Sequence, residues 1–203
     1  IYEKLNEKRL LGATMGLIGV DFSEQKSYYK ALDYCKNSLQ IGLEVKDMTL
    51  VTDQYNNLAT IYYVGFHNLQ KALDYYFKSL EVSIKIDDFQ MQGSTMLDIG
   101  SIYLEMNQLD SSIFYLSKSL ELLNKVDNSI LKANCQIGIG RYYFRMSRFA
   151  DAKRFAIFGL EIGEEFGNLQ TLYKASDLLY NISLSENDSL GAFRYLIIRT
   201  ATN

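Results

Sequence analysis

Apolar side chains in residues 52–88 fall into two stripes with helical spacing. From Thr52 to Val64 the apolar and small residues recur at three- and four-residue steps, as Tyr55, Leu58, Ala59 and Tyr62. This spacing is typical of the buried face of an α-helix. Gly65-Phe66-His67-Asn68 interrupts the pattern, and a second stripe runs from Leu69 to Ile86. The segment therefore predicts a helix, a tight turn and a second helix, which ends at Asp87-Asp88.

The second predicted helix carries a ten-residue phrase that returns four more times. The phrase is ALDYYFKSLE at 72–81, and weaker copies lie at 31–40, 112–121, 152–161 and 192–201. Successive copies are 41, 40, 40 and 40 residues apart. A fixed period of this length is the signature of a stacked array of structural repeats. The extra residue of the first step is an insertion around Gly65–Asn68.

Short polar residues mark the turn that follows each predicted helix pair. Asp47, Asp88, Asn128 and Asn168 are 41, 40 and 40 residues apart. Asp and Asn side chains accept hydrogen bonds from the free amides of a first helical turn, so we expect these residues to cap the next helix. Gly167 precedes Asn168 and fits the left-handed conformation that often ends a helix.

The first helix of each pair repeats a large apolar residue, then a small one, and an aromatic residue three positions after that. The large-small pairs are Ile18-Gly19, Leu58-Ala59, Ile99-Gly100 and Ile139-Gly140, and the aromatic residues are Phe22, Tyr62, Tyr103 and Tyr143. A small residue lets the second helix approach closely, and the ring fills the space beside it. The small residues that open each phrase, Ala31, Ala72, Ser112, Ala152 and Ala192, predict the same close packing.

Over nearly the whole chain this pattern resembles the tetratricopeptide repeat (TPR), in the form found in sensory arrays of bacterial, Bacteroidota-like signalling proteins. The motif has small residues at its eighth, twentieth and twenty-seventh positions and an aromatic residue at its eleventh. The twenty-seventh position here is Ser38, Ser79, Ser119 and Gly159. The chain departs from the motif in its 40-residue period, in place of about 34, and in lacking the usual proline. The fifth unit has Tyr180 and Ser183 at the small and aromatic positions.

The resemblance implies an all-α fold, an α-α superhelix or TPR-like solenoid of about five helix-turn-helix repeats. We expect a single array over residues 1–203, with repeats at 8–47, 48–88, 89–128, 129–168 and 169–203. Asn6-Glu7 falls where a turn between repeats is expected, so residues 1–7 are predicted to end a truncated preceding repeat. The last unit lacks a polar capping helix, which solenoids need to stay soluble. We therefore expect flanking chain, or another copy, at the ends of the array.

The composition of the chain favours helices and excludes some classes of function. The chain has no proline, which would break helices, and no run of about 18 apolar residues long enough to span a membrane. Its 24 acidic and 21 basic residues give a net charge of −3, which argues against nucleic acid as a direct partner. Cys35 and Cys135 lie in different repeats, and we expect two buried thiols rather than a disulfide or a metal site.

The sequence predicts no catalysis, cofactor or metal. His67 is the only histidine and lies in the irregular turn without an evident Ser or Cys partner. Gly12–Gly19 lacks both the preceding strand and the Gly-Lys-Ser/Thr ending of a phosphate loop, so helix packing explains its glycines better. Asp87-Asp88 and Glu164-Glu165 are expected as solvated residues at helix ends rather than as an acid-base pair.

The TPR resemblance also implies that the first helix of each pair lines a concave groove. The groove positions give the candidate ligand-binding residues Asn56, Asn57, Thr60, Tyr63, Asp98, Glu105, Asn134, Arg141, Phe144, Arg145, Asp177 and Asn181. They also include Asp53 and Lys174, whereas the first repeat offers only Ala13, Gly16, Val20 and Glu24.

Asparagine has a donor beside an acceptor and matches the backbone amide of an extended peptide. Tyr63 and Phe144 would be stacking anchors, and Arg141 with Arg145, one turn apart, would hold a carboxylate. The alternatives are a solvated polar face, or pairing of these arginines with Asp98 and Glu105.

Together these features predict non-catalytic binding of a protein or peptide. The resemblance implies an input or scaffolding module of a bacterial signalling or regulatory protein. Such a module is periplasmic when it is fused to a membrane-bound kinase and cytoplasmic otherwise.

Two alternative functions stay open. One is a self-associating scaffold, with a homodimer formed through the exposed array ends. The other is the regulatory domain of an enzyme, a histidine kinase or nucleotide cyclase, whose catalytic part lies outside this chain. The sequence does not identify the ligand.

Overall fold

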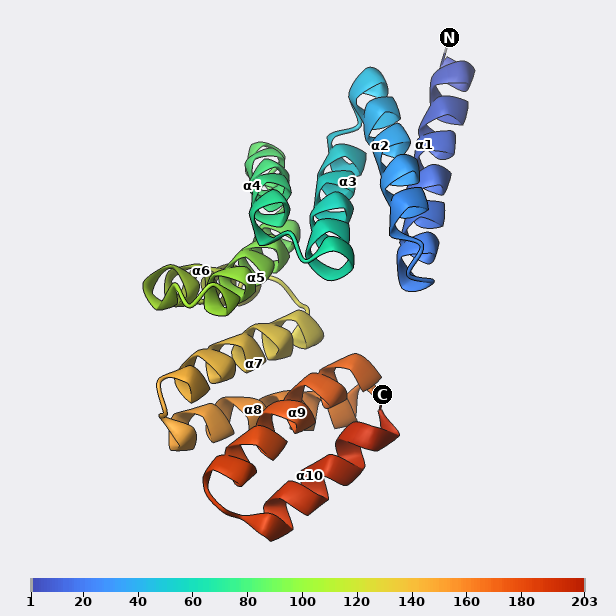
Figure 1. Cartoon of the computed structure of the whole chain (residues 1–203). Helices are drawn as coiled ribbons and strands as arrows, with labels where there is room; N and C mark the ends of the chain where they lie inside the picture. Colours follow the sequence, from blue (N-terminus) through green and yellow to red (C-terminus); the bar gives the residue numbers. More distant parts are fainter. Residues whose placement is uncertain (1, 203) are drawn as a thin grey trace. The chain divides into compact units, whose positions relative to one another are not determined.

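The computed structural model describes residues 2–202, and the regular structure within that range is entirely helical (Figure 1). Five successive helix pairs form it. They are α1 (Tyr2–Glu24) with α2 (Tyr28–Val45), α3 (Met48–Thr60) and the π-helix η1 (Ile61–Gly65) with α4 (Leu69–Lys85), α5 (Phe89–Glu105) with α6 (Leu109–Leu123), α7 (Ser129–Arg145) with α8 (Phe149–Glu165), and α9 (Leu169–Ser185) with α10 (Ser189–Ala201). The predicted all-α fold of helix-turn-helix units is confirmed.

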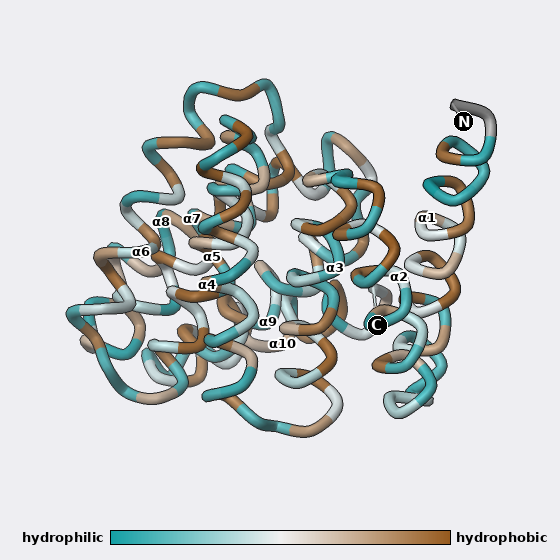
Figure 2. The backbone as a smooth tube through the Cα atoms, turned by 90° about the horizontal axis from the view of Figure 1, so that it is seen from above, coloured by the Kyte–Doolittle hydropathy of each residue, from teal (hydrophilic) through white to brown (hydrophobic). Residues whose placement is uncertain are grey.

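The chain divides into two compact units, one ending at Thr95 and the other beginning at Met96. In the first unit α1 packs along α2, and α3 packs on α2 and α4. In the second unit α7 packs on α6 and α8, and α9 packs on α8 and α10. Along the helices the hydropathy alternates at short intervals, as expected when one side of each helix is buried (Figure 2). The predicted repeat bounds at 47/48, 88/89, 128/129 and 168/169 fall between helices, whereas the bound at 7/8 falls within α1. The single array over the whole chain stays a prediction.

The small residues of the repeat allow the paired helices to approach closely. A Cβ atom added to Gly19 would lie 2.6 Å from Sγ of Cys35, and one added to Gly100 would lie 2.8 Å from Cγ of Leu116. Ala31, Ala72 and Ala152 are completely buried at the same crossings. Gly12 and Gly16 likewise lie against Ile41 and Gln54, so packing accounts for the glycines of this segment. The predicted close packing is confirmed.

Aromatic rings fill the space beside these crossings, as predicted. In the second pair, the ring of Tyr62 stacks on that of Tyr75 with 5.5 Å between centroids. The first, third and fourth pairs form the same contact, as Phe22–Tyr34, Tyr103–Tyr115 and Tyr143–Phe155, at 5.4, 5.6 and 5.6 Å. Each stack ties the first helix of a pair to the second.

The Asx residues between pairs cap the helices that follow them. The side chains of Asp47, Asp88, Asn128 and Asn168 accept hydrogen bonds of 3.1, 2.9, 3.0 and 2.9 Å from backbone amides three residues on. The prediction is confirmed, and Asn68 and Asp188 cap α4 and α10 in the same way. Gly167 has the predicted left-handed conformation, with a φ of 61°.

The π-helix η1 absorbs the extra residue of the second repeat. In the first and third pairs, the turn is closed by a bond between residues five apart, from Ser27 N to Phe22 O and from Gln108 N to Tyr103 O. In the second pair, the equivalent bond runs from Asn68 N to Tyr62 O, six residues back. A π turn widens the helix by one residue, so the insertion leaves the packing of Tyr62 and Ala72 in register.

The turn predicted at Asn6-Glu7 is wrong. Helix α1 runs unbroken from Tyr2 to Glu24. Residues 4–9 are mostly Lys, Leu, Glu and Arg, which favour helix, and no glycine or proline interrupts them. Lys8 pairs with Glu44 and Arg9 with Asp47, so the N-terminal part of α1 lies along the end of α2. The prediction for residue 1 lies outside the described residues.

Cys35 and Cys135 are both free and completely buried, as predicted. Burial raises the pKa of each thiol to about 11, which keeps it protonated and unreactive at neutral pH. Sγ of Cys135 donates a hydrogen bond to the carbonyl oxygen of Leu116 at 3.3 Å.

In the part of the chain that the structure describes, no helix has the length and apolar character to cross a bilayer.

Candidate functional site

A pocket of about 300 Å³ lies between the first helices of three successive pairs in the first unit. It is lined by Ala13, Gly16, Leu17 and Val20 of α1, by Leu50, Asp53, Gln54, Asn56 and Asn57 of α3, and by Met91 of α5. We call it the amide pocket. Asn56 and Asn57 are predicted groove residues, and Asp53 and the small residues of α1 are predicted groove positions. The structure therefore brings these positions together.

Contacts within the pocket orient its amide side chains. Nδ2 of Asn56 donates to Oγ1 of Thr95 at 3.2 Å, which ties it to α5. Gln54 is buried above Gly16, where an added Cβ would lie 2.6 Å from its Nε2. Nδ2 of Asn57 points to Oε1 of Gln54 at 3.5 Å, the limit of a hydrogen bond. The absent side chain of Gly16 thus makes room for the amide of Gln54 on α3.

Asp53 is the charged residue of this lining. Burial raises the pKa of its carboxyl group, and the charges of Asp88 and Asp47 raise it further. The pocket therefore combines amides, a small apolar wall and negative potential, which favours a ligand that donates hydrogen bonds.

Thr60 and Tyr63 follow the pocket residues along the chain. Oγ1 of Thr60 donates to the carbonyl oxygen of Asn56 at 3.1 Å and lies 3.0 Å from the hydroxyl group of buried Tyr76. Thr60 therefore joins α3 to α4. Tyr63 is partly buried within η1, and its role as a stacking anchor stays a prediction.

In the second unit, the charge of Lys174 on one first helix is coupled to a charged residue on each of two other first helices. Burial raises the pKa of Asp98 on α5 to about 7, and the positive charge of Lys174 on α9 acts in the opposite direction. Burial lowers the pKa of Lys174; Asp98 raises it, and Arg141 on α7 lowers it. We call Asp98, Arg141 and Lys174 the charged cluster. Lys174 thus lies within electrostatic range of predicted groove positions on α5 and α7.

Arg141 and Arg145 are both exposed. The pairing of these arginines with Asp98 and Glu105 that the sequence left open stays a prediction. Glu105 is exposed at the end of α5. Phe144 packs beside the buried cluster around Ile137, and its ring lies 5.7 Å from that of Phe149.

The remaining predicted residues of the second unit bond to neighbouring groups. Oδ1 of Asn134 accepts from Oγ1 of Thr171 on α9 at 3.3 Å. Nδ2 of Asn181 donates to the carbonyl oxygen of Asp177 at 2.8 Å. Asp177 forms an ion pair with Arg199 of α10, with 3.1 Å between Oδ1 and Nη1. These three side chains therefore have internal partners as well as partial exposure.

Comparison with known proteins shows the same architecture. No family model matches the chain, and no curated protein matches its sequence. BtubC (BKLC) from P. vanneervenii has a similar structure, with a TM-score of 0.78 and 18% identity, over 100% of this chain and 85% of that one. A Podosopora anserina protein, described as a kinesin light chain with nearly identical TPR-like repeats, gives 0.66 and 11%, over 96% and 95% of the two chains.

A third similar structure is a Signal Transduction ATPase with Numerous Domains (STAND) from Pyrococcus horikoshii, which has a TPR sensor. It gives a TM-score of 0.70 and 18% identity over 99% of this chain and 35% of that protein. The chain has a TPR-like fold. The identities are low, so these likenesses establish the architecture of this TPR-like chain and not its ligand.

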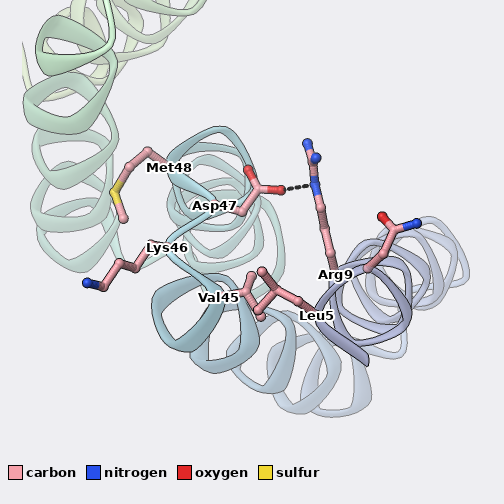
Figure 3. A pocket seen from close by; sticks show the side chains of 7 residues that line it. Leu5, Arg9, Val45, Lys46, Asp47 and Met48 are labelled. Carbon is pink, nitrogen blue, oxygen red and sulfur yellow. Dashed lines mark ion pairs between the residues drawn. The ribbon is translucent and has the colours of Figure 1, made fainter. Parts of the chain in front are cut away.

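Sequence reasoning missed a second cavity of the TPR-like chain, which measures about 700 Å³. Leu5, Asn6 and Arg9 of α1 line it on one side, and Val45, Lys46, Asp47 and Met48 line it on the other (Figure 3). The cavity exists because α1 continues past the expected turn. Its ion pair is Arg9–Asp47, and Asp47 also caps α3.

Among residues 2–202, no three His, Cys, Asp or Glu side chains are grouped to hold a metal ion.

Proposed function

We propose that this TPR-like chain is a non-catalytic module that binds an extended segment of another protein along its first helices. The amide pocket is the observation that carries the proposal, because α1, α3 and α5 each contribute side chains to it. Its volume of about 300 Å³ suits one side chain and the adjoining backbone of a peptide. Asn57 would bond that backbone, and Asn56 is already held in place by Thr95.

The lining also favours one kind of side chain. Leu17, Val20 and Leu50 supply an apolar wall, and Asp53 supplies a carboxyl group at its edge. A lysine or arginine would place its aliphatic stem on that wall and its charged end at Asp53. In the second unit, Arg141 is exposed and cationic beside Lys174, so an acidic group on the ligand would bind there.

The role of an input or scaffolding module in a signalling or regulatory protein is part of the same proposal. It is supported by the likeness of this fold to the TPR sensor of a signal transduction ATPase. In a bacterial parent protein the module would be periplasmic beside a membrane-bound kinase and cytoplasmic otherwise. It would then transmit ligand binding to an output domain.

The test uses peptides selected from a random twelve-residue display library on the immobilised chain. Synthetic copies are titrated by calorimetry into the wild type and the variants Asp53→Asn and Asn57→Ala. Each variant is expected to weaken binding by about 3- to 10-fold, the usual effect of one lost hydrogen bond. Gln70→Ala, on the exposed side of α4, is the matched control and should bind like the wild type.

Circular dichroism checks that helicity is unchanged in all three variants. A library that yields no binding peptide contradicts the proposal. So do peptides whose affinity is the same for the wild type and both pocket variants.

A further inference from the structure

A third pocket, of about 410 Å³, lies where the turns of the first two helix pairs meet. These turns join α1 to α2 and η1 to α4, and they lie at the same end of their helices (Figure 1). The pocket combines aromatic rings, ammonium groups and a glycine, from Lys26, Tyr28, Tyr29, Lys30, Gly65 and Phe66. We call it the turn pocket. None of these six residues lines the amide pocket.

The ring of Phe66 holds the aromatic side chains of the turn pocket together. Its centroid lies 5.2 Å from that of Tyr29, 5.8 Å from that of Tyr62 and 6.1 Å from that of Tyr28. A Cβ atom added to Gly65 would lie 2.5 Å from Cγ of Tyr28, so the glycine lets this ring lie against the backbone. The rings are therefore positioned by one another before a ligand arrives, which lowers the entropy cost of binding.

Tyr29 presents its ring to solvent at a position that no helix pair covers. It is 78% exposed although its ring contacts that of Phe66. The equivalent residues of the other four pairs are exposed as well: Gln70, Asp110, Ala150 and Leu190. The exposure of this ring therefore does not depend on where its pair stands in the chain. Packing between successive pairs leaves the ring available to a ligand.

The insertion of the second pair places an aromatic residue in its turn. Phe66 precedes His67, which has a left-handed conformation with a φ of 48°. The residues that precede the left-handed residue in the equivalent turns of the other pairs are Gln25, Met106, Met146 and Glu186. The longer turn, widened by η1, thus supplies a ring that those turns lack. Single π turns of this kind are frequent at functional sites.

Lys26 and Lys30 give the turn pocket its charge. Both residues are exposed, and Nζ of Lys30 lies 5.1 Å from the centroid of the Phe22 ring. Within residues 2–202, the lining of this pocket includes no Asp or Glu. The lining is therefore cationic, in contrast to the amide pocket with its Asp53, and it favours a ligand that carries negative charge.

We propose that the turn pocket binds a small planar aromatic anion, a molecule in which an aromatic ring carries a carboxylate or phosphate group. The ring stacks on Tyr29 and Phe66, and the acidic group pairs with Lys26 and Lys30. A volume of about 410 Å³ is within the range of small-molecule sites and accommodates a two-ring molecule with its acidic group. This inference is independent of peptide binding in the amide pocket.

The test titrates two aromatic anions, indole-3-acetate and adenosine monophosphate, into the chain by calorimetry. Each has two matched partners. Indole-3-ethanol and adenosine keep the ring without the charge, and acetate and inorganic phosphate keep the charge without the ring. At least one aromatic anion is expected to bind with a Kd below about 1 mM and at least about tenfold more tightly than either of its partners. The tighter of the two anions shows whether the pocket prefers a carboxylate or a phosphate.

Two variants locate the binding in the turn pocket. Tyr29→Ala removes the exposed ring, and Lys26→Gln with Lys30→Gln removes both charges. Each variant is expected to weaken binding by about 3- to 10-fold. The matched controls are Phe114→Ala on α6, where the ring is 56% exposed, and Lys36→Gln on the exposed side of α2. Both controls should bind like the wild type, and circular dichroism tests that every variant is folded.

Three results would overturn the proposal. The first is that neither aromatic anion binds. The second is an uncharged or ring-free partner that binds as tightly as its aromatic anion, because the pocket would then not require both groups. The third is equal affinity for the wild type and both pocket variants, which would place the site elsewhere. Asp53→Asn and Asn57→Ala should bind the aromatic anion like the wild type, which keeps this result separate from the peptide proposal.

Discussion

The guanidinium group of Arg199 lies over the ring of Tyr180, 4.5 Å from its centroid. Both residues occupy positions that are small in the other pairs, where Gly140 and Gly159, for example, stand in the fourth. Arg199 also forms the ion pair with Asp177. In the fifth pair, a cation–π contact and an ion pair therefore stand where the other pairs have close contact between small residues.

Replacing this arginine should weaken the last pair. Arg199→Ala removes the cation–π contact and the ion pair, both partly shielded from water, and is expected to cost about 1–2 kcal/mol of unfolding free energy. Urea unfolding followed by circular dichroism measures the change. Arg194→Ala on the exposed side of the same helix is the control and should change the midpoint little. Equal midpoints for the two variants would contradict a structural role for Arg199.

Enlarging the small residue at a helix crossing should destabilise the second pair. Ala72 is completely buried. Leucine there would force the helices apart or displace neighbouring side chains, so Ala72→Leu should cost about 1–3 kcal/mol. The same urea titration measures it, with Gln70→Leu on the exposed side of α4 as the control. A wild-type midpoint for Ala72→Leu would argue against the repeat register.

The carboxyl group of Asp98, which is partly buried, should make stability depend on pH. Its pKa rises from an ordinary value of 3.8 to about 7 on folding, chiefly through burial. Between these values the folded state binds more protons than the unfolded state, so this group lowers stability as pH rises from about 4 to about 7. Asp98→Asn removes this dependence and should be more stabilising, relative to the wild type, at pH 8 than at pH 4. Unfolding at both pH values measures the difference, and a pH-independent difference would contradict the raised pKa.

Reversing the exposed cations of α7 should abolish binding of ligands with an acidic group. Arg141→Glu with Arg145→Glu changes two exposed side chains, the first of which acts on Lys174, and leaves the buried residues in place. Affinity for an acidic library-selected peptide is expected to fall by more than about tenfold, while helicity stays the same. Lys118→Glu, exposed on α6, supplies the control for net charge. Unaltered affinity in a calorimetric titration would remove these arginines from the site.

The helix pairs and their caps could be predicted because the physics behind them is local. The side chain of Asp47 caps α3 by accepting a hydrogen bond from a backbone amide three residues away. A small residue such as Gly100 is needed where one helix crosses its partner closely. The turn at Asn6-Glu7 could not be placed by extending the period. A helix ends where a breaker or a cap ends it, and residues 4–9 contain neither a glycine nor a proline.

The site was predictable only in part, because the partner of a polar side chain is set by tertiary contacts. Asn56 and Asn57 were identified by their repeat positions, but the hydrogen bond from Asn56 to Thr95 joins residues on separate helices. Arg199 was missed because its position on a second helix is one where the motif has a small residue. The sequence did contain a signal for Arg199, because the equivalent residues of the other pairs are small: Ser38, Ser79, Ser119 and Gly159.

The π turn at Ile61–Gly65 shows how an array of this kind can change length without losing its packing. The added residue is confined to one turn, and the ring stack made from that turn, Tyr62 on Tyr75, keeps a separation of 5.5 Å, against 5.6 Å in the third and fourth pairs. A one-codon insertion at this point therefore costs the later repeats nothing. Surveys that search genomes for such arrays with a rigid period will consequently undercount them, and a search that allows one extra residue before the second helix will recover more.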